Sequence, residues 1–252
     1  MLRTVGHLGR LMRVGYAFAR EGVLGLVDTE ALPAPAALGI RALRLLERRG
    51  TGGSASRLSA ALSRLGPSYV KLGQFLATRP DVVGDALATD LEQLQDRMPP
   101  FPMAQARETI RRALGRPVEE LFVSFSEPVA AASIAQVHSA VVRNRAGERH
   151  VAVKVLRPGV AARFQRDLDT FYWVARRMER WHPPSRRLRP VAVVDTLAHS
   201  VTLEMDLRLE AAALSEMGEN TAHDPGFRVP GVEWDRVARE VLTLEWNDGI
   251  PL

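Results

Sequence analysis

The chain has 252 residues, of which 46% are hydrophobic and 25% are charged, proportions typical of a soluble globular protein. It contains no cysteine, which excludes disulfides, thiolate metal sites and cysteine nucleophiles. The net charge of +5 suits an anionic membrane surface or nucleic acid. Because the arginines are spread along the chain without an aromatic-interleaved basic run, we expect no nucleic-acid partner.

The first predicted element is an amphipathic helix over residues 2–27. Its apolar residues share one face, with four arginines beside them: Leu2, Val5, Leu8, Met12, Tyr16, Ala19, Val23 and Leu26, and Arg3, Arg10, Arg13 and Arg20. This pattern is typical of a helix that lies in a membrane interface, although a helix packed on the rest of the protein shows it too. No stretch is long and apolar enough to span a bilayer.

Further helices are predicted up to residue 118. A proline-containing segment, 32–35, separates the first helix from a second over 36–49, and the glycine-rich segment 50–54 forms a flexible joint. Residues 55–97 have a helical pattern, which Gly66 and Pro67 divide, and its last helix covers 81–97. Another helix is expected over 103–114, ending at Gly115.

The pattern changes to a strand period after residue 118. Short segments rich in valine and phenylalanine predict strands at 121–125, 136–143 and 150–156, with a hairpin turn at 144–148. Helical spacing returns over 161–181 and, after a Pro/Arg-rich loop at 182–190, over a long helix at 191–217. Two more strands are expected near 227–233 and 238–246. The fold class is therefore α+β, with a five-stranded antiparallel sheet.

Only two lysines occur, Lys71 and Lys154, against thirty-two arginines. Arginine evidently serves wherever a surface cation is needed, so the two lysines mark candidate sites for a compact, flexible ammonium. Alternatively, a general drift of the composition toward arginine would leave these two lysines by chance, without any functional role.

Three strands, a helix and two strands, with Val-Ala-Val-Lys154 in the third strand, is the element order of a protein-kinase small lobe. The glycine-rich phosphate loop of such a lobe is replaced by the alanine-rich segment 130–135, followed by Gln136-Val137-His138. Alanine still lets the backbone approach a ligand closely, but it disfavours the positive φ angles that glycine permits.

With this alanine-rich segment, the chain resembles the UbiB/ABC1 (AarF) family of atypical kinase-like proteins, and the resemblance covers residues 55–252. The motifs that carry it are, in chain order, Lys71-Leu72-Gly73-Gln74, the alanine-rich segment, Glu204-Met205-Asp206 followed by Glu210-Ala211-Ala212, and Leu242-Thr243-Leu244-Glu245-Trp246 with Gly249-Ile250-Pro251-Leu252. The residues of these motifs are most similar to those of bacterial members that support ubiquinone biosynthesis.

The resemblance implies a role for each site residue. Lys154 would contact the α- and β-phosphates of ATP and pair with Glu210, and the remaining nucleotide-binding residues would be Ala131, Ala132, Ser133, Ala135 and Glu245. Lys71 and Gln74 would meet Glu204 and Asp206 and so plug the cleft where a protein substrate would otherwise lie. Taken singly, these acidic residues could equally form a solvated helix face. His138 reads as structural.

The resemblance also divides the chain and bounds its chemistry. The expected parts are an amphipathic helical segment at 1–50, the helical Lys-x-Gly-Gln extension at 51–118, packed on the sheet domain, and a kinase-like small lobe at 119–252 that ends at the hinge, with the large lobe absent. No segment offers the aspartate and asparagine of a catalytic loop or an Asp-Phe-Gly element. We therefore expect no catalytic residue, no metal ligand and negligible turnover from these 252 residues alone, with ATP and Mg²⁺ used only by an intact protein.

Two classes of function remain open. The chain is the amino-terminal part of an atypical kinase or ATPase that supports ubiquinone biosynthesis, or it is a non-catalytic, pseudokinase-like module that binds nucleotide, lipid or a partner. Any role in quinone-ring hydroxylation would be accessory. The expected partners are ATP, an anionic membrane surface contacted by residues 2–27, and quinone-biosynthesis enzymes or lipid intermediates. The expected location is the cytoplasmic side of a bacterial inner membrane, with peripheral association.

Overall fold

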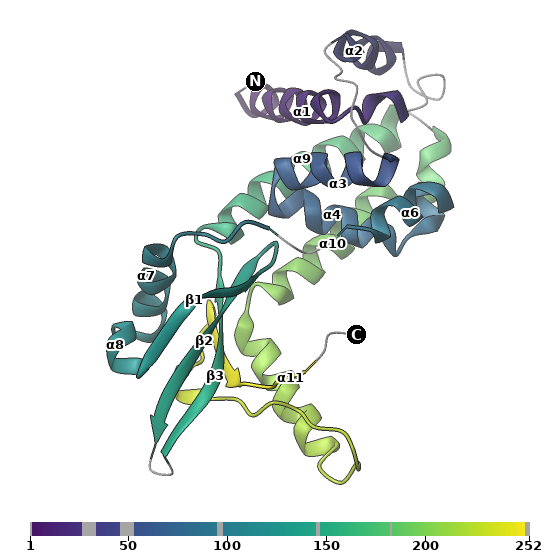
Figure 1. Cartoon of the computed structure of the whole chain (residues 1–252). Helices are drawn as coiled ribbons and strands as arrows, with labels where there is room; N and C mark the ends of the chain where they lie inside the picture. The colour runs from purple at the N-terminus through teal and green to yellow at the C-terminus, as the bar shows by residue number, and fades with distance from the viewer. Residues whose placement is uncertain are drawn as a thin grey trace. The chain divides into compact units, whose positions relative to one another are not determined.

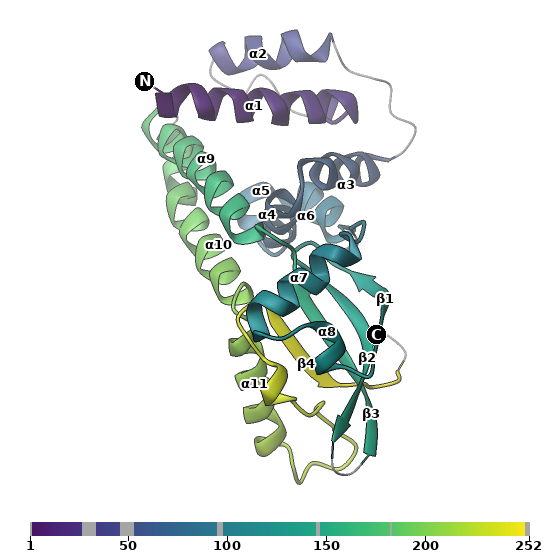
Figure 2. The ribbon, with the colours of Figure 1, turned by 90° about the vertical axis from the view of Figure 1, so that its left-hand side faces the viewer.

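The computed structural model describes residues 2–26, 34–45, 53–94, 98–144, 147–181 and 183–249. The chain divides into two compact units, each built from two segments of sequence (Figures 1 and 2). The helical unit comprises Met1–Asp96 and Ala162–Ala198, and the sheet unit comprises Arg97–Ala161 and His199–Leu252. Both units therefore depend on contacts between segments far apart in the sequence.

The helical unit consists of α-helices and two short 3₁₀ helices. Its elements are α1 (Leu2–Arg20), η1 (Leu24–Leu26), α2 (Ala34–Arg44), α3 (Ser54–Leu65), α4 (Pro67–Ala77), α5 (Pro80–Val83), α6 (Asp85–Glu92), most of α9 (Val160–Trp181), η2 (Pro183–Leu188) and the first part of α10 (Pro190–Glu204). Helix α4 packs against α3 and α6, and α1 packs against α3 and α2. The helix predicted at 2–27 ends at Arg20 and is followed by η1, and the helix predicted at 36–49 begins at Ala34. Residues 27 and 46–49 of these predictions lie outside the described residues.

Two glycines shape the centre of this unit. Gly66 has φ +109°, a conformation that favours glycine, and it separates α3 from α4, whose first residue is Pro67. Gly73 lies in α4 where a Cβ atom would stand 2.8 Å from Leu62 and 2.7 Å from Leu94. The absence of a side chain at residue 73 therefore allows α4 to approach its neighbours closely.

The sheet unit contains a four-stranded antiparallel sheet in the order β1-β2-β3-β4. Its strands are β1 (Ser124–Ala131), β2 (Ala135–Asn144), β3 (Gly147–Leu156) and β4 (Val241–Glu245), and its helices are α7 (Met103–Leu114), α8 (Val118–Leu121), α11 (Leu207–Asn220) and the short η3 (Trp234–Arg236). Lys154 pairs with Val137 on one side and with Leu242 on the other. The third strand is therefore central to the sheet.

The pleat of β3 separates the core from the candidate site. Val151, Val153 and Val155 are buried in the cluster that includes Ile110 of α7. Because side chains alternate across a strand, Lys154 lies on the opposite face. Helices α7 and α8 lie on one side of the sheet and α11 on the other, as both views show (Figures 1 and 2).

Four predicted elements differ from the structure. The helix predicted over 81–97 is two short helices, α5 and α6, which Gly84 separates with φ +84°, and α6 ends at Glu92. The described residues form four strands rather than five, because the segment 227–233 contributes only an isolated bridge between Val232 and Leu244. Pro230 lacks an N–H and cannot extend that pairing. Residues 118–121 form a helical turn, α8, and β1 begins at Ser124 instead of residue 121.

The long helix predicted over 191–217 is two helices, α10 and α11, separated at Met205 and Asp206. Asp206 adopts an extended conformation, with φ −125° and ψ 92°, and its carboxylate accepts a hydrogen bond from the N–H of Arg208. This is an N-cap, which begins a new helix. The apolar periodicity continues through both helices and gives no sign of the break.

Candidate nucleotide-binding site

The candidate site is centred on the ammonium of Lys154. Its Nζ donates to both carboxylate oxygens of Glu210, at 2.9 Å and 2.8 Å. The side chains are 31% and 40% exposed, so a solvent-borne ligand can reach them. An ion pair with this exposure contributes about 0–1 kcal/mol to stability. Its main effect is therefore to hold the ammonium in one position above the sheet.

Local sequence explains how the two groups meet. The alternation of β3 directs Lys154 away from the valine core, and the cap at Asp206 starts α11 four residues before Glu210. Arg208 donates to both oxygens of Asp206, and this contact holds the pKa of the Asp206 carboxyl below its usual range. Asp206 thus acts here as the anchor of the helix that presents Glu210.

The turn between β1 and β2, residues 132–134, occupies the place of a kinase phosphate loop, and Arg157 holds it in shape. The Arg157 guanidinium donates to the carbonyl of Ala132 at 2.8 Å and 3.0 Å and to the carbonyl of Pro99 at 2.9 Å. The Arg157 N–H donates to the carbonyl of Ile134, and the N–H of Ala132 donates to the carbonyl of Ala135. The turn is closed by these bonds, without the conformational freedom of glycine.

The predicted phosphate-contacting residues differ in exposure. Ala131 and Ala132 are partly exposed, whereas Ser133 and Ala135 are buried, at 0% and 1%. A direct contact between the Ser133 hydroxyl and a phosphate would need the turn to open, so this role stays a prediction.

Gln136 and His138 form a buried polar chain behind the turn. The Gln136 carbonyl accepts from the N–H of Phe101 at 2.9 Å, and its amide nitrogen lies 2.9 Å from Nε2 of His138. His138 Nδ1 lies 2.9 Å from the carbonyl of Ser126, and burial lowers the pKa of the imidazole. A neutral ring that donates from Nδ1 and accepts at Nε2 satisfies both contacts. His138 is therefore structural, as the sequence suggested.

Glu245 lies at the end of β4, where the alternation from Leu242, the partner of Lys154, places its side chain on the face opposite Lys154. Its carboxylate accepts from Arg228 and from the N–H of Gly231, and its own N–H donates to the carbonyl of Gly231. Any contact of this segment with an adenine ring would therefore use backbone groups, and that contact stays a prediction. The last predicted motif residues, 250–252, lie outside the described residues.

The predicted plug residues occupy different units. Lys71 and Gln74 lie on α4 of the helical unit, both partly exposed, whereas Glu204 and Asp206 belong to the sheet unit. The contact between these pairs stays a prediction. Within the described part of the chain, no three histidine or acidic side chains gather as a metal site.

Sequence reasoning missed Arg157, which anchors the turn, and the role of Gln136 in reaching Phe101. Both act on backbone groups distant in sequence, and an arginine directly after a strand carries no pattern that announces such a contact.

Comparison with known proteins places this arrangement in a family. Residues 93–252 match the ABC1 atypical kinase-like domain. The chain is 40% identical over 248 residues to a protein of Marinobacter nauticus named "Probable protein kinase UbiB", a match that covers 98% of this chain and 45% of the relative. The chain belongs to the ABC1 atypical kinase-like family.

Two Pseudomonas relatives of the same name extend this result. Proteins of Pseudomonas paraeruginosa and Pseudomonas aeruginosa are each 41% identical over 198 residues, which covers 78% of this chain and 37% of each relative. This ABC1-family chain therefore spans less than half the length of the curated relatives it matches. Its α+β fold, with an antiparallel sheet flanked by α7 and α11, is that of a kinase-like small lobe.

Proposed function

We propose that this chain is the amino-terminal part of a UbiB-type atypical kinase or ATPase that binds ATP through Lys154 and the β1–β2 turn. We propose further that the intact protein supports ubiquinone biosynthesis. The observation that carries the first proposal is the bidentate contact between Lys154 and Glu210 on the face of the sheet opposite its core. The relatives' printed name, a probable protein kinase, agrees with a phosphate-directed lysine.

Lysine suits this position because of its shape. A compact ammonium can donate two of its hydrogens to Glu210 and the third to a phosphate oxygen. A planar guanidinium is bulkier and holds its donors in a fixed fork. ATP and Mg²⁺ would be the cofactors of the intact protein. The residues proposed here hold nucleotide only, and none of them is assigned as a metal ligand.

The experiment is a titration of the 252-residue protein with a fluorescent ATP analogue. We expect Lys154→Arg and Glu210→Gln each to weaken binding at least tenfold, because both disturb the position of the ammonium. The matched control is Glu240→Gln, which loses a partner of Arg112 outside the proposed site. An affinity that Lys154→Arg leaves unchanged would remove Lys154 from the proposal.

We also propose that the helical unit associates peripherally with an anionic membrane, on the cytoplasmic side of a bacterial inner membrane. Helix α1 exposes Leu8, Met12 and Tyr16, at 54%, 60% and 52%, with a spacing of four residues that places them in one row. A row of exposed apolar side chains on a basic helix suits the membrane interface. In the described part of the chain, no helix combines the length and hydropathy needed to cross a bilayer.

A further inference from the structure

Two cavities of the helical unit meet at Tyr69. The apolar cavity, of about 390 Å³, is lined by residues of α1, α4, α5, α9, η2 and α10, among them Leu11, Leu72, Phe171 and Val174. The arginine cavity, of about 310 Å³, is lined by Arg10, Arg13, Arg163, Arg166, Asp167 and Tyr69. Tyr69 lines both, so an apolar hollow and a cationic hollow share one wall.

The arginine cavity holds more positive charge than its own residues neutralise. Arg13 and Arg163 both donate to the carbonyl of Leu65, at 3.4 Å and 3.5 Å, which brings two guanidiniums to a single neutral acceptor. Among the described residues, no carboxylate lies within 4 Å of any of the four guanidiniums. Asp167 is the one acidic residue that lines the cavity, against four arginines. An anion would therefore be attracted to this position.

The apolar cavity has the size and lining of a ligand pocket. Its volume falls within the range of about 300 to 1,000 Å³ that is usual for small-molecule sites, and hydrocarbon side chains line almost all of it. Tyr69 packs edge-on against Phe171, with ring centroids 5.2 Å apart. A hydrocarbon tail would replace water in this cavity.

Polar groups stand beside Tyr69, the residue that lines both cavities. Arg10 donates to the hydroxyl of Thr170 at 2.8 Å, and Thr170 also lines the apolar cavity. Burial raises the pKa of Tyr69 to about 12, so its phenol stays a neutral donor at physiological pH. Within the described residues, the Tyr69 hydroxyl makes no hydrogen bond to another group.

We propose that the two cavities form one binding site for a single-chain anionic amphiphile. Its phosphate or carboxylate headgroup lies among Arg10, Arg13, Arg163 and Arg166, its hydrocarbon tail fills the apolar cavity, and Tyr69 donates to the headgroup at the junction. This site lies wholly within the helical unit and does not depend on nucleotide binding at Lys154.

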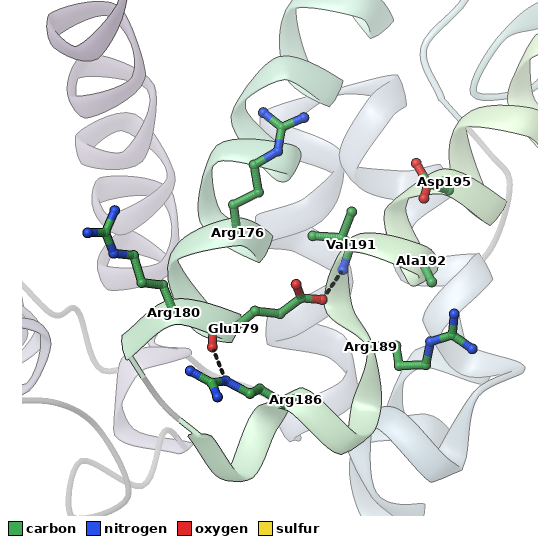
Figure 3. Close-up of a pocket in the computed structure, with 8 residues that line it drawn as sticks. All are labelled: Arg176, Glu179, Arg180, Arg186, Arg189, Val191, Ala192 and Asp195. Carbon is green, nitrogen blue, oxygen red and sulfur yellow. Dashed lines mark hydrogen bonds between the residues drawn. The ribbon is translucent and has the colours of Figure 1, made fainter.

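A second basic hollow in the same unit lacks these properties. It is larger, at about 690 Å³, and lies between the ends of α9 and α10. The guanidiniums of Arg176, Arg180 and Arg189 point in different directions (Figure 3). Glu179 accepts from the N–H of Val191 at 3.1 Å and so fixes the connection between the helices. This hollow supplies a matched control for the arginine cavity.

The test is calorimetric titration of the 252-residue protein with dodecyl phosphate, below the concentration at which it forms micelles. We expect saturable one-to-one binding. Inorganic phosphate and butyl phosphate should each bind at least a hundredfold more weakly because they leave the apolar cavity unfilled. Dodecanol should bind at least tenfold more weakly because it leaves the guanidiniums unneutralised. Equal binding of inorganic phosphate would reduce the site to a simple anion site and overturn the proposal.

Variants locate the site. The double variant Arg13→Gln/Arg163→Gln should lose at least tenfold in affinity for dodecyl phosphate, whereas the control Arg176→Gln/Arg189→Gln should keep it. Val174→Trp should block the tail, and circular dichroism would show whether this filled variant is folded. If Val174→Trp is not folded, the double variant Arg13→Gln/Arg163→Gln is the deciding test. An unchanged affinity of that double variant for dodecyl phosphate would refute the proposal.

A last variant separates this site from membrane association. Met12→Glu changes the exposed row of α1, and Met12 is not among the residues that line either cavity. It should keep dodecyl phosphate binding even where it loses vesicle binding. Loss of both by Met12→Glu would show that the amphiphile binds to the surface of α1 and would overturn the cavity assignment.

Discussion

Lys154 and His138 show how the same strand pair treats two titratable residues differently. Lys154 lies on the face of the sheet opposite the valine core and pairs with the carboxylate of Glu210. His138 is fully buried beside Gln136 and Phe125, and its ring stacks on Phe125 with centroids 4.4 Å apart. Burial makes its charged form unfavourable, so the imidazole serves as a neutral bridge.

His138 should make the stability of the sheet unit depend on pH. Burial holds the folded-state pKa of His138 below the ordinary 6.5. The hydrogen bond to Ser126 and the charge of Glu127 oppose this lowering, whereas the charge of Arg107 adds to it. The unfolded chain therefore takes up a proton first as pH falls through about 6.5, and stability is lost. We expect the melting temperature to fall more between about pH 7.5 and 5.5 in the native protein than in His138→Asn.

The control for this pH effect is His150→Asn. His150 is exposed at the far end of β3, so its replacement should leave the pH dependence as it is. The comparison uses melting curves followed by circular dichroism. Identical slopes against pH in the native protein and His138→Asn would show that another group is responsible.

One contact of the candidate site could be predicted at the level of single residues. The pairing of Lys154 with Glu210 followed from the family motifs, and the structure places the two groups in contact. The anchoring of the turn by Arg157 could not be predicted, because its acceptors are backbone carbonyls brought close only by the fold. The periodicity of a sequence shows which side chains are apolar, but it does not show which polar side chains bond to distant backbone groups.

The helices α4 and α11 each carry a residue predicted for the site, Lys71 and Glu210. Predicted helix ranges hold where local signals are strong: 103–114 matches α7, and 161–181 differs from α9 by one residue. The break between α10 and α11 escaped prediction because the N-cap aspartate lies inside a continuous apolar pattern. A cap residue is informative only where the periodicity also stops.

Gly73→Ala should destabilise the helical unit. Alanine favours a helix by about 1 kcal/mol over glycine, but its Cβ would stand within 2.8 Å of two buried leucines, Leu62 and Leu94. Overpacking of this kind costs about 1–3 kcal/mol, so we expect a net loss of stability in urea unfolding. The matched control, Gly9→Ala in exposed α1, meets nothing within 4 Å and should be neutral or stabilising. A higher stability of Gly73→Ala would show that α4 and its neighbours accommodate a Cβ atom at residue 73.

Asp206→Ala should weaken the start of α11. Loss of an N-cap costs about 0.5–2 kcal/mol, whereas Asp206→Asn keeps a cap acceptor and should stay close to the native value. The free energy of unfolding in urea measures both variants. Equal stability of Asp206→Ala and Asp206→Asn would show that the capping bond contributes nothing.

At the level of the whole molecule, the two units differ in kind. The sheet unit buries a valine-rich core between β-strands and α7, and it lies within the residues that match the ABC1 domain. The helical unit carries the cavities at Tyr69 and the exposed row on α1. We therefore propose nucleotide binding for the sheet unit and lipid contact for the helical unit.

Met12→Glu should reduce sedimentation of the protein with phosphatidylglycerol vesicles at least fivefold. It places a carboxylate in the exposed apolar row of α1, where it is repelled by anionic lipid. Phe227→Glu, an equally exposed apolar position in the sheet unit, is the control and should bind like the native protein. Binding should also weaken as salt rises from about 50 to 500 mM, because counterions screen the attraction. Vesicle binding that Met12→Glu leaves intact would exclude α1 as the contact.

The two lysines fall one in each unit, Lys71 in α4 and Lys154 in β3. An endoprotease that cleaves only after lysine therefore has one site per unit, and each lies inside a regular element that must open before it can be cut. The lengths of the resulting peptides tell which site was cleaved, and the cleavage rates report the opening free energies of the two units separately. Because lysine is so rare in this chain, its two lysines report local unfolding of the two units without any added label.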